Sequence, residues 1–315
     1  MATPWMGAGT GIGIGKETTW GTAVAAAKWF PLVTVAGGRR IQRDATPHLI
    51  VGGAGGRRDY FSVRESTEGS FTVLARYTGL GYLLEACMGA VATTGASSPY
   101  THTHTLSGAL PALTLRVCRG SSGSDQLIEG AKVNGWALSV AAGELMKLRL
   151  DYIAQTEQAR ADIAAGTYET GEIIAHQHAG VLGFNSQTYA AQSIEISQSN
   201  QVARVDELGS LMTSEPAVAT NLRESKFKVT LVSRSDTLFT EHLAGTQGDA
   251  TITFTGGTSP NATLFTLKNA VVTAFDDPIS SQNFWTQTVE LTGHADSSNE
   301  GLIVAQTNGQ ANYYD

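Results

Sequence analysis

The sequence has few of the features that mark several classes of protein. Only 16% of its 315 residues are charged, against roughly 25% in an ordinary soluble domain, and it has only 8 prolines and 2 cysteines. No apolar run approaches the roughly 18 residues of a membrane-spanning helix. Lysine and arginine (21) are outnumbered by aspartate and glutamate (28), so the net charge is −7. A chain this acidic is poorly suited to holding nucleic acid through its phosphates.

The two cysteines do not suggest a disulfide framework. Cys87 and Cys118 each lie among apolar neighbours, and secreted disulfide scaffolds are small and dense in cysteine. We therefore expect two buried free thiols. The opening residues lack the basic and apolar regions of a secretory signal, and we expect a protein that folds in a cytoplasm.

Short strands dominate the predicted secondary structure. Polar turn residues separate segments in which apolar residues alternate or run together, which favours a β-sandwich or barrel. The apolar spacing of 78–89 and 235–245 instead predicts two helices, with Ser235 as an N-cap and Gly89 and Gly245 as C-caps. The predicted strands are 71–77, 113–119, 136–140, 145–153, 193–197, 227–233, 250–255 and 263–269.

The two predicted helices belong to an internal duplication. Residues 68–89 align with residues 224–245 without a gap, at an offset of 224 − 68 = 156, which places Phe71 on Phe227 and Glu85 on Glu241. Repeated order of this kind is the signature of tandem structural units. The flanking segments follow the same order: 33–44 resembles 194–206, and 130–140 with 148–154 resembles 267–277 with 289–295.

We therefore predict a mainly β protein with two tandem domains, each a β-sandwich or barrel with one flanking α-helix. The first domain covers residues 29–165 and the second covers residues 166–315. A Gly-rich arm (1–28) precedes them, a long loop (36–60) interrupts the first, and a tail (296–315) ends the second. Segments of such mobile composition are expected to become ordered on docking.

The predicted long loop is rich in arginine. Long loops in compact domains are usually functional or disordered. This one could be a solvated charged loop, a dock for an acidic surface of a neighbouring copy, or a DNA contact, although the acidic balance of the chain argues against DNA. The candidate inter-subunit contact residues are Arg39, Arg40, Arg43, Arg57 and Arg58.

No motif predicts a catalytic residue, a cofactor site or a metal site. The Gly-rich run at 7–15 lacks the spacing of a phosphate loop, and Glu17 stands where Ser or Thr is required. The His-x-His pairs at 102/104 and 176/178 could each offer two imidazoles from one strand face, but no nearby cysteine or carboxylate completes a ligand set. No Gly-x-Ser-x-Gly elbow is present.

Several motifs resemble those of one known family. The segment GIGKETTWGTAVAAAKWFPLVT (13–34) resembles the opening of tail tube (major tail) proteins of long-tailed bacteriophages. ALPALTLRV (109–117) is similar to the family's Leu-Pro-Ser-Leu-Thr strand, with Ala112 in place of Ser. Residues 129–154 resemble its Gly-x-Lys-Val-Asn strand, Ala-Ala-Gly turn and returning strand. The resemblance covers most of the chain, and the loop 36–60 is its clearest departure.

The resemblance implies a structural virion protein, with no enzymatic activity and no cofactor. Such proteins polymerise into stacked rings that form the tail tube, here of a non-contractile siphophage tail, and the tube carries DNA into the host cell. The implied partners are other copies in the ring, the stacked rings, and the tail terminator and distal tail proteins. The tape measure protein and genomic DNA would pass through the lumen without specific binding. No membrane partner is implied, and assembly would take place in the host cytoplasm.

The resemblance also implies six tube domains in each ring. Two domains in each chain then predict three chains per ring with pseudo-sixfold symmetry, and a ring of six chains is the alternative. One ring would then stack on the next through the Gly-rich arm, the loop 36–60 and the tail 296–315. An adhesive or carbohydrate-binding β-sandwich module of a tail tip or fibre is a competing interpretation. It would require an exposed platform of aromatic side chains.

Overall fold

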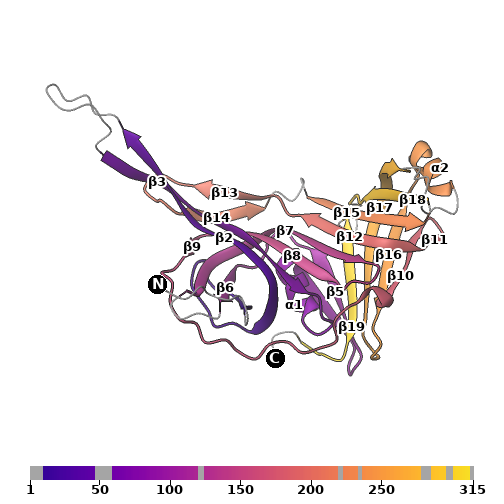
Figure 1. The fold of residues 1–315 in the computed structure, drawn as a ribbon, viewed down its shortest axis with the longest axis horizontal. Helices are drawn as coiled ribbons and strands as arrows, with labels where there is room; N and C mark the ends of the chain where they lie inside the picture. The colour runs from indigo at the N-terminus through magenta and orange to yellow at the C-terminus, as the bar shows by residue number, and fades with distance from the viewer. Residues whose placement is uncertain are drawn as a thin grey trace, which may run out of the picture.

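The computed structural model describes residues 10–46, 59–119, 124–218, 223–232, 236–277, 285–295 and 301–312. The fold is mainly β, as the sequence predicts, with two short α-helices (Figure 1). Among these residues, none of the helices combines the length and the apolar character needed to cross a membrane. Cys87 and Cys118 are buried free thiols, as expected.

The elements follow one another in a simple order along the chain. The helices are α1 (Leu80–Met88) and α2 (Thr237–Ala244), and a 3-10 turn spans His176–His178. The strands are β1 Gly11–Lys16, β2 Lys28–Thr46, β3 Asp59–Leu74, β4 Gly89–Thr94, β5 Tyr100–Leu106, β6 Leu113–Cys118, β7 Gln126–Ala141, β8 Lys147–Ala154, β9 Thr156–Glu157, β10 Ala179–Phe184, β11 Gln187–Tyr189, β12 Ala191–Ser199, β13 Val202–Asp206, β14 Thr213–Val218, β15 Glu224–Val232, β16 Gln247–Thr255, β17 Ala262–Asp276, β18 Thr286–Thr292 and β19 Leu302–Asn308.

A continuous antiparallel sheet runs through the whole molecule. Its strand order is β2-β3-β8-β7-β12-β15-β18-β17. Because successive side chains in a strand point to opposite faces, the sheet has one apolar face and one polar face. The apolar face supplies much of the core, and the polar face carries charged side chains. Buried core residues of the sheet include Phe71, Trp136, Leu150, Ile196, Phe227 and Leu291.

The same order of strand pairing occurs twice. In the first half it is β1-β6-β7-β8-β3-β2, and in the second half it is β10-β16-β17-β18-β15-β12. The first set closes into a barrel because β1 also pairs with β2, and Figure 1 shows β2 curving around it. Among the described strands, no pairing of β10 with β12 closes the second set.

Strand pairing supports the alignment of the two halves at β7 and β17. Thr72 and Ala137 face the same residue of β8, and Lys228 and Ala274 face the same residue of β18. With β3 and β15 aligned at 228 − 72 = 156, β7 and β17 therefore correspond at 274 − 137 = 137, the offset that the sequence comparison gave. Both strands also contain a bulge, after Val133 in β7 and after Val272 in β17.

The helices end where the sequence predicts. Gly89 and Gly245 adopt the left-handed conformation and donate their N–H groups to the carbonyls of Glu85 and Glu241, which confirms them as C-caps. The predicted N-cap Ser235 lies outside the described residues, and Asp236 precedes the first helical residue of α2 without a side-chain cap.

The predicted N-terminal arm is wrong at Gly11–Lys16. That segment is β1, which pairs with both β2 and β6 and buries Ile12 and Ile14 completely. The alternating glycines give room to aromatic rings, because a Cβ on Gly11 would lie 2.3 Å from the Tyr168 ring and one on Gly13 would lie 2.7 Å from the Trp29 ring. The Gly-x-Gly pattern therefore marks a buried strand under aromatic side chains.

The predicted loop 36–60 and tail 296–315 are also wrong in part. Residues 36–46 continue β2 and residues 59–60 begin β3, and the two strands pair as far as Thr46 opposite Asp59. Residues 47–58 lie outside the described part of the chain. Residues 302–308 of the predicted tail form β19, which pairs with β17 and β5. In both segments cross-strand hydrogen bonds, which depend on distant partners, override a composition that suggests mobility.

Candidate assembly interfaces

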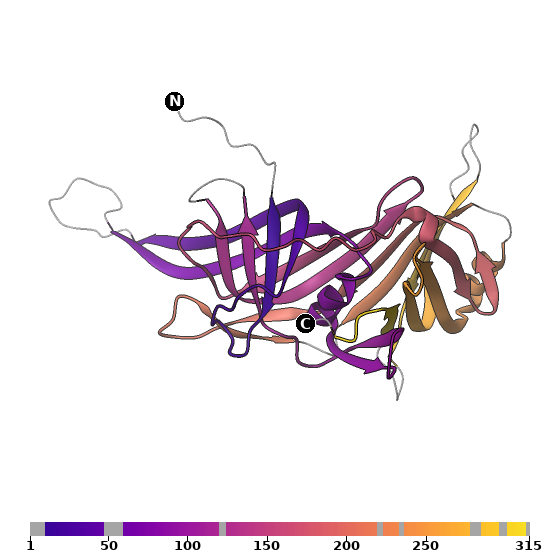
Figure 2. The ribbon, with the colours of Figure 1, turned by 90° about the horizontal axis from the view of Figure 1, so that it is seen from below.

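β2 and β3 extend beyond the barrel as a two-stranded arm, visible in Figures 1 and 2. Gly37 and Gly38, at φ values of 103° and 138°, face Glu68 and Gly69 where the arm begins. A Cβ on Gly37 would lie 2.3 Å from the Cα of Gly69, so glycine is required there. β8 accompanies β3 only from Thr67 onward, and the two arm strands therefore pair only with each other among the described strands.

Three of the five arginines predicted to contact another subunit lie in the arm. Arg39 and Arg40 lie in β2 at the base of the arm, and Arg43 lies further along β2, opposite Ser62. Arg57 and Arg58 lie outside the described residues. The structure therefore brings Arg39, Arg40 and Arg43 onto one strand, and their contact with another subunit stays a prediction.

Arg39 is held by a buried acidic network within its own chain. Its Nη2 lies 2.7 Å from Oε2 of Glu65, a side chain that is almost fully buried. Its backbone N–H donates to Glu157 (2.8 Å), and the Thr156 hydroxyl donates to the other oxygen of Glu65 (3.0 Å). A buried carboxylate requires such partners. Even so, two fifths of the Arg39 side chain (41%) remains exposed, leaving donors for a second contact.

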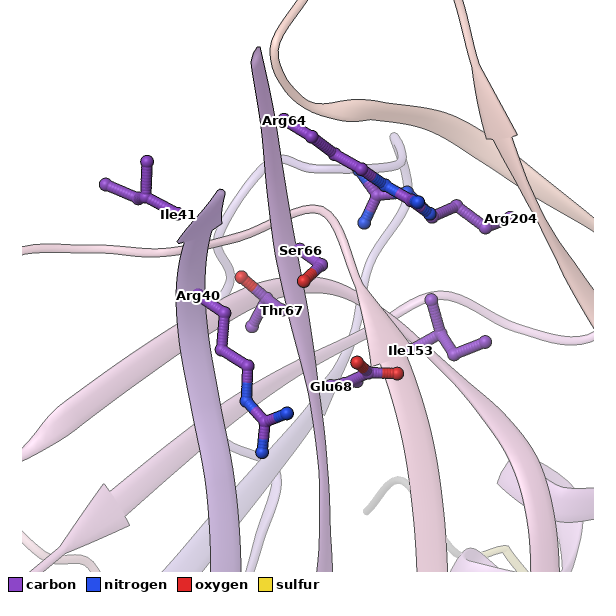
Figure 3. Close-up of a pocket in the computed structure, with 8 residues that line it drawn as sticks. All are labelled: Arg40, Ile41, Arg64, Ser66, Thr67, Glu68, Ile153 and Arg204. Atoms are coloured by element: carbon purple, nitrogen blue, oxygen red, sulfur yellow. The ribbon is translucent and has the colours of Figure 1, made fainter. Parts of the chain in front are cut away.

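Arg40 instead lines a cleft of about 410 Å³ at the base of the arm (Figure 3). Arg64 and Arg204 also line the cleft, and both form ion pairs with Asp206. Arg40 forms no ion pair or hydrogen bond with any residue that the structure describes. The cleft therefore carries one cation whose charge these residues leave unpaired, next to the exposed Glu68.

A hairpin of the second half fastens the arm to the barrel. β13 and β14 pair with each other, and the loop between them accepts the backbone N–H of Glu65 at the Leu211 carbonyl (2.8 Å). Lys132, buried in β7, lies 2.7 Å from Glu215 of β14. The direction of the arm is therefore fixed by contacts from both halves of the chain.

The two halves join through an antiparallel pairing of β7 with β12. The register runs from Ser193 opposite Ala141 to Ser199 opposite Gly135. Ile196 and Trp136 are buried at this junction. Burial of such side chains is worth roughly 1.5–3 kcal/mol each, so the junction is part of the core.

Asn200 closes the junction at one end. Its backbone N–H donates to the Asn134 carbonyl (2.8 Å), which continues the strand pairing by one residue. Its side-chain Nδ2 donates to the carbonyls of Val133 (3.0 Å) and Cys87 (2.8 Å), and Asn200 is fully buried. Cys87 lies in the last turn of α1, so a residue of the second half satisfies the helix end of the first.

The matching edges at the two ends of the sheet are open. β2 pairs with β1 only as far as Pro31, and β17 pairs with β16 only as far as Val271. Beyond these points, no described strand pairs with residues 33–38 on that edge of β2 or with residues 272–276 on that edge of β17. Val35 and Phe275, at these edges, are only partly buried against the core. Unpaired edges of this kind are templates for pairing with another chain.

The histidine pairs do not form metal sites in the part of the chain that the structure describes. His102 and His104 are buried in β5, and His102 bonds Thr93 and the Gln310 carbonyl, at 2.8 Å each. Burial, with a smaller effect from His102, lowers the pKa of His104 to about 3. His176 and His178 lie in a 3-10 turn rather than on a strand. The described residues contain no group of three His, Cys, Asp or Glu side chains that could hold a metal ion.

Reasoning from the sequence missed Asn200 and the two open edges. The sequence offered one weak signal for Asn200: it is a residue that favours turns and it follows the predicted strand 193–197. The edges had no comparable signal, because the partner of a strand is not encoded locally.

The fold and these surfaces define a mainly β structural protein whose central sheet ends in two open edges and whose arm carries arginines. The chain matches the family described as Phage tail tube protein over residues 7–301. It belongs to that family and is a structural component of a phage tail tube, in the tail of the virion. This confirms the resemblance seen in its motifs. Among curated proteins, no sequence matches it.

Proposed function

We propose that the chain polymerises into stacked rings that form the channel for DNA ejection, and that each ring contains three chains. One observation carries this proposal: the pairing of β7 with β12 joins two units of the same pairing order and leaves the matching edges open at both ends. If the junction within the chain is repeated between chains, the polymer is head-to-tail, and a head-to-tail interface closes into a ring when its rotation permits.

The junction within the chain sets the register between chains. β2 corresponds to β12 at an offset of 196 − 35 = 161, because Val35 faces Phe71 as Ile196 faces Phe227. β17 corresponds to β7 at the offset of 274 − 137 = 137. The counterparts of Ser197 and Ala137, which face each other, are then Ala36 of one copy and Ala274 of the next. Val35 and Phe275 become the counterparts of the buried Ile196 and Leu138, which also face each other.

Each chain contributes two units, 29–165 and 166–315 by the sequence duplication, so three chains supply six units. This gives pseudo-sixfold symmetry, in which the junction within a chain and the junction between chains alternate around the ring. A ring of six chains would hold twelve units. The eight strands of the central sheet would line one third of the smaller ring.

The polar face of the sheet suits a channel wall past which DNA slides. Its cations lie beside carboxylates: Lys226 is 3.0 Å from Glu290, and Arg149 is 2.9 Å from Asp151. A cation that is already paired gains less from a phosphate, and the net charge of −7 repels the polyanion. The tape measure protein and DNA would pass through this lumen without specific binding.

The arm and its arginines are proposed to reach neighbouring copies. The arm projects beyond the barrel (Figure 2), so it can contact a stacked ring, and Arg40 offers an unpaired charge to an acidic surface there. Tail terminator and distal tail proteins would meet the end rings, in a non-contractile tail assembled in the host cytoplasm. The adhesive alternative requires a platform of exposed aromatic side chains, and no observation favours it. Trp29 and Trp136 are core residues, and Trp285 is the most exposed of the described tryptophans.

Disulfide trapping tests the proposed junction. The pair Ala36–Ala274 corresponds to Ser197–Ala137, which lies three residues from the hydrogen-bonded Asn200–Asn134 pair. Because the two kinds of pair alternate, Ser197–Ala137 has no mutual backbone hydrogen bonds, and such pairs have the closest Cα atoms, about 4.5 Å apart. The variant A36C/A274C should form disulfide-linked trimers on oxidation of assembled protein. The matched control A36C/D276C is two residues out of register and should form few. Equal trapping in both variants contradicts the register, and a six-membered ladder contradicts three chains per ring.

A further inference from the structure

The two helices differ in how much of their surface the chain covers. Every residue of α1 is buried, whereas in α2 only Leu238 and Glu241 are buried. Phe239 is 43% exposed and Leu243 is 71% exposed. At the offset of 156, they correspond to Leu83 and Cys87, which have almost no exposed surface. α2 therefore presents an apolar face whose counterpart in α1 is covered.

Part of the cover over α1 comes from the other half of the chain. Asn200 Nδ2 donates to the Cys87 carbonyl in the last turn of α1. In α2 the counterpart of that carbonyl is the carbonyl of Leu243, to which no described residue donates. In β17, which packs against α2, the carbonyl of Val272 already accepts a hydrogen bond from His242 Nδ1 (2.8 Å). The open acceptor is therefore the one at the helix end.

The residue that corresponds to Asn200 in β2 is Arg39, at the offset of 161. By strand alternation, Ile41 lies on the same face as Arg39, and it is partly exposed. An arginine suits this position chemically, because a helix C-terminus carries partial negative charge and unpaired carbonyls. The guanidinium has five donors, of which the pairing with Glu65 occupies only part.

We propose that the C-terminal end of α2 is the docking site for the base of the arm of the next copy, with Arg39 at the Leu243 carbonyl and Ile41 against Leu243 and Phe239. The occupant is a second copy of this chain. This inference rests on the proposed ring and specifies what lies outside its strand junction. It assigns Arg39 to the contact within a ring and leaves Arg40, in the cleft of Figure 3, on the opposite face of β2.

Cross-linking in assembled protein tests the contact separately from the ring. In I41C/L243C, a short bismaleimide should link neighbouring copies. In the matched control I41C/T237C it should not, because Thr237 is exposed on the same helix but lies more than 100° around its axis from Leu243. Trimers of A36C/A274C without linkage in I41C/L243C overturn this contact and leave the ring intact. Failure of both overturns the contact and the ring together.

Charge variants give a second readout that does not depend on cysteine. Leu243 is largely exposed, so L243K should leave the isolated protein folded while placing a cation against Arg39, and the concentration needed for polymerisation should rise roughly tenfold. L243E places a carboxylate there and should raise it much less. T237K, the matched control, should leave it unchanged. An equal effect of L243K and L243E contradicts a role for Arg39.

Discussion

Replacing Asn200 by alanine should destabilise the isolated protein strongly, because this side chain joins the two halves. In N200A the carbonyls of Val133 and Cys87 lose the Nδ2 donor. Each buried carbonyl left without a partner costs about 1–3 kcal/mol. Asn200 Oδ1 has no hydrogen-bond partner, so its removal returns about 1 kcal/mol or more. We expect a net loss of about 2–4 kcal/mol in the free energy of unfolding, which is large against typical totals of roughly 5–15 kcal/mol.

Urea unfolding followed by tryptophan fluorescence measures this loss, at a concentration below that at which the protein polymerises. Trp136 lies in the same junction and reports on it directly. The matched control is Q201N, because Gln201 is exposed, has a φ of 50° and is next in the chain; asparagine tolerates that conformation. Q201N should change stability by less than about 0.5 kcal/mol. A loss below about 0.5 kcal/mol in N200A would refute the view that this junction is part of the core.

Three further predictions concern acid, charge at the open edge, and the arm. Since the pKa of His104 is lowered to about 3 from 6.5, the unfolded state binds more protons between these pH values, so stability should fall as pH drops through that window, by up to about 1.4 kcal/mol per pH unit from this group; urea unfolding at several pH values should show a flatter dependence in H104Q. A36D/A274D places two carboxylates opposite each other at the junction, which should weaken each junction by about 0.2–1 kcal/mol, and sedimentation should show less polymer in A36D/A274D than in A36D/A274K. Since Thr46 faces Asp59, replacing 47–58 by a two-residue turn should leave circular dichroism unchanged and reduce the length of tubes seen by electron microscopy, and tubes of normal length would contradict the role of the arm in stacking.

Local patterns in the sequence were enough to predict the elements whose signals are local. The helices followed from apolar spacing and from Gly89 and Gly245, which occupy left-handed C-caps. The repeated order of strands followed from an ungapped similarity around Phe71 and Phe227. These features depend on residues a few positions apart, which is why one sequence suffices to find them.

Features that depend on distant partners were not predicted. β1 has only Ile12 and Ile14 as apolar residues, and its glycines make sense only once the rings of Tyr168 and Trp29 are placed over them. The strands of the arm are rich in glycine and arginine, which have little strand preference, and their pairing with each other supplies the order. The assignment of Arg39 to a buried network likewise required the position of Glu65, 26 residues away.

The reconstruction of assembled tubes by electron cryomicroscopy tests the central claim most directly. The account predicts three chains in each ring, with β17 of one copy paired antiparallel to β2 of the next and Ala36 opposite Ala274. At this junction Val35 and Phe275 should be buried, like Ile196 and Leu138 within the chain. A ring of six chains, or a ring in which β2 and β17 of neighbouring copies are not paired, would contradict it.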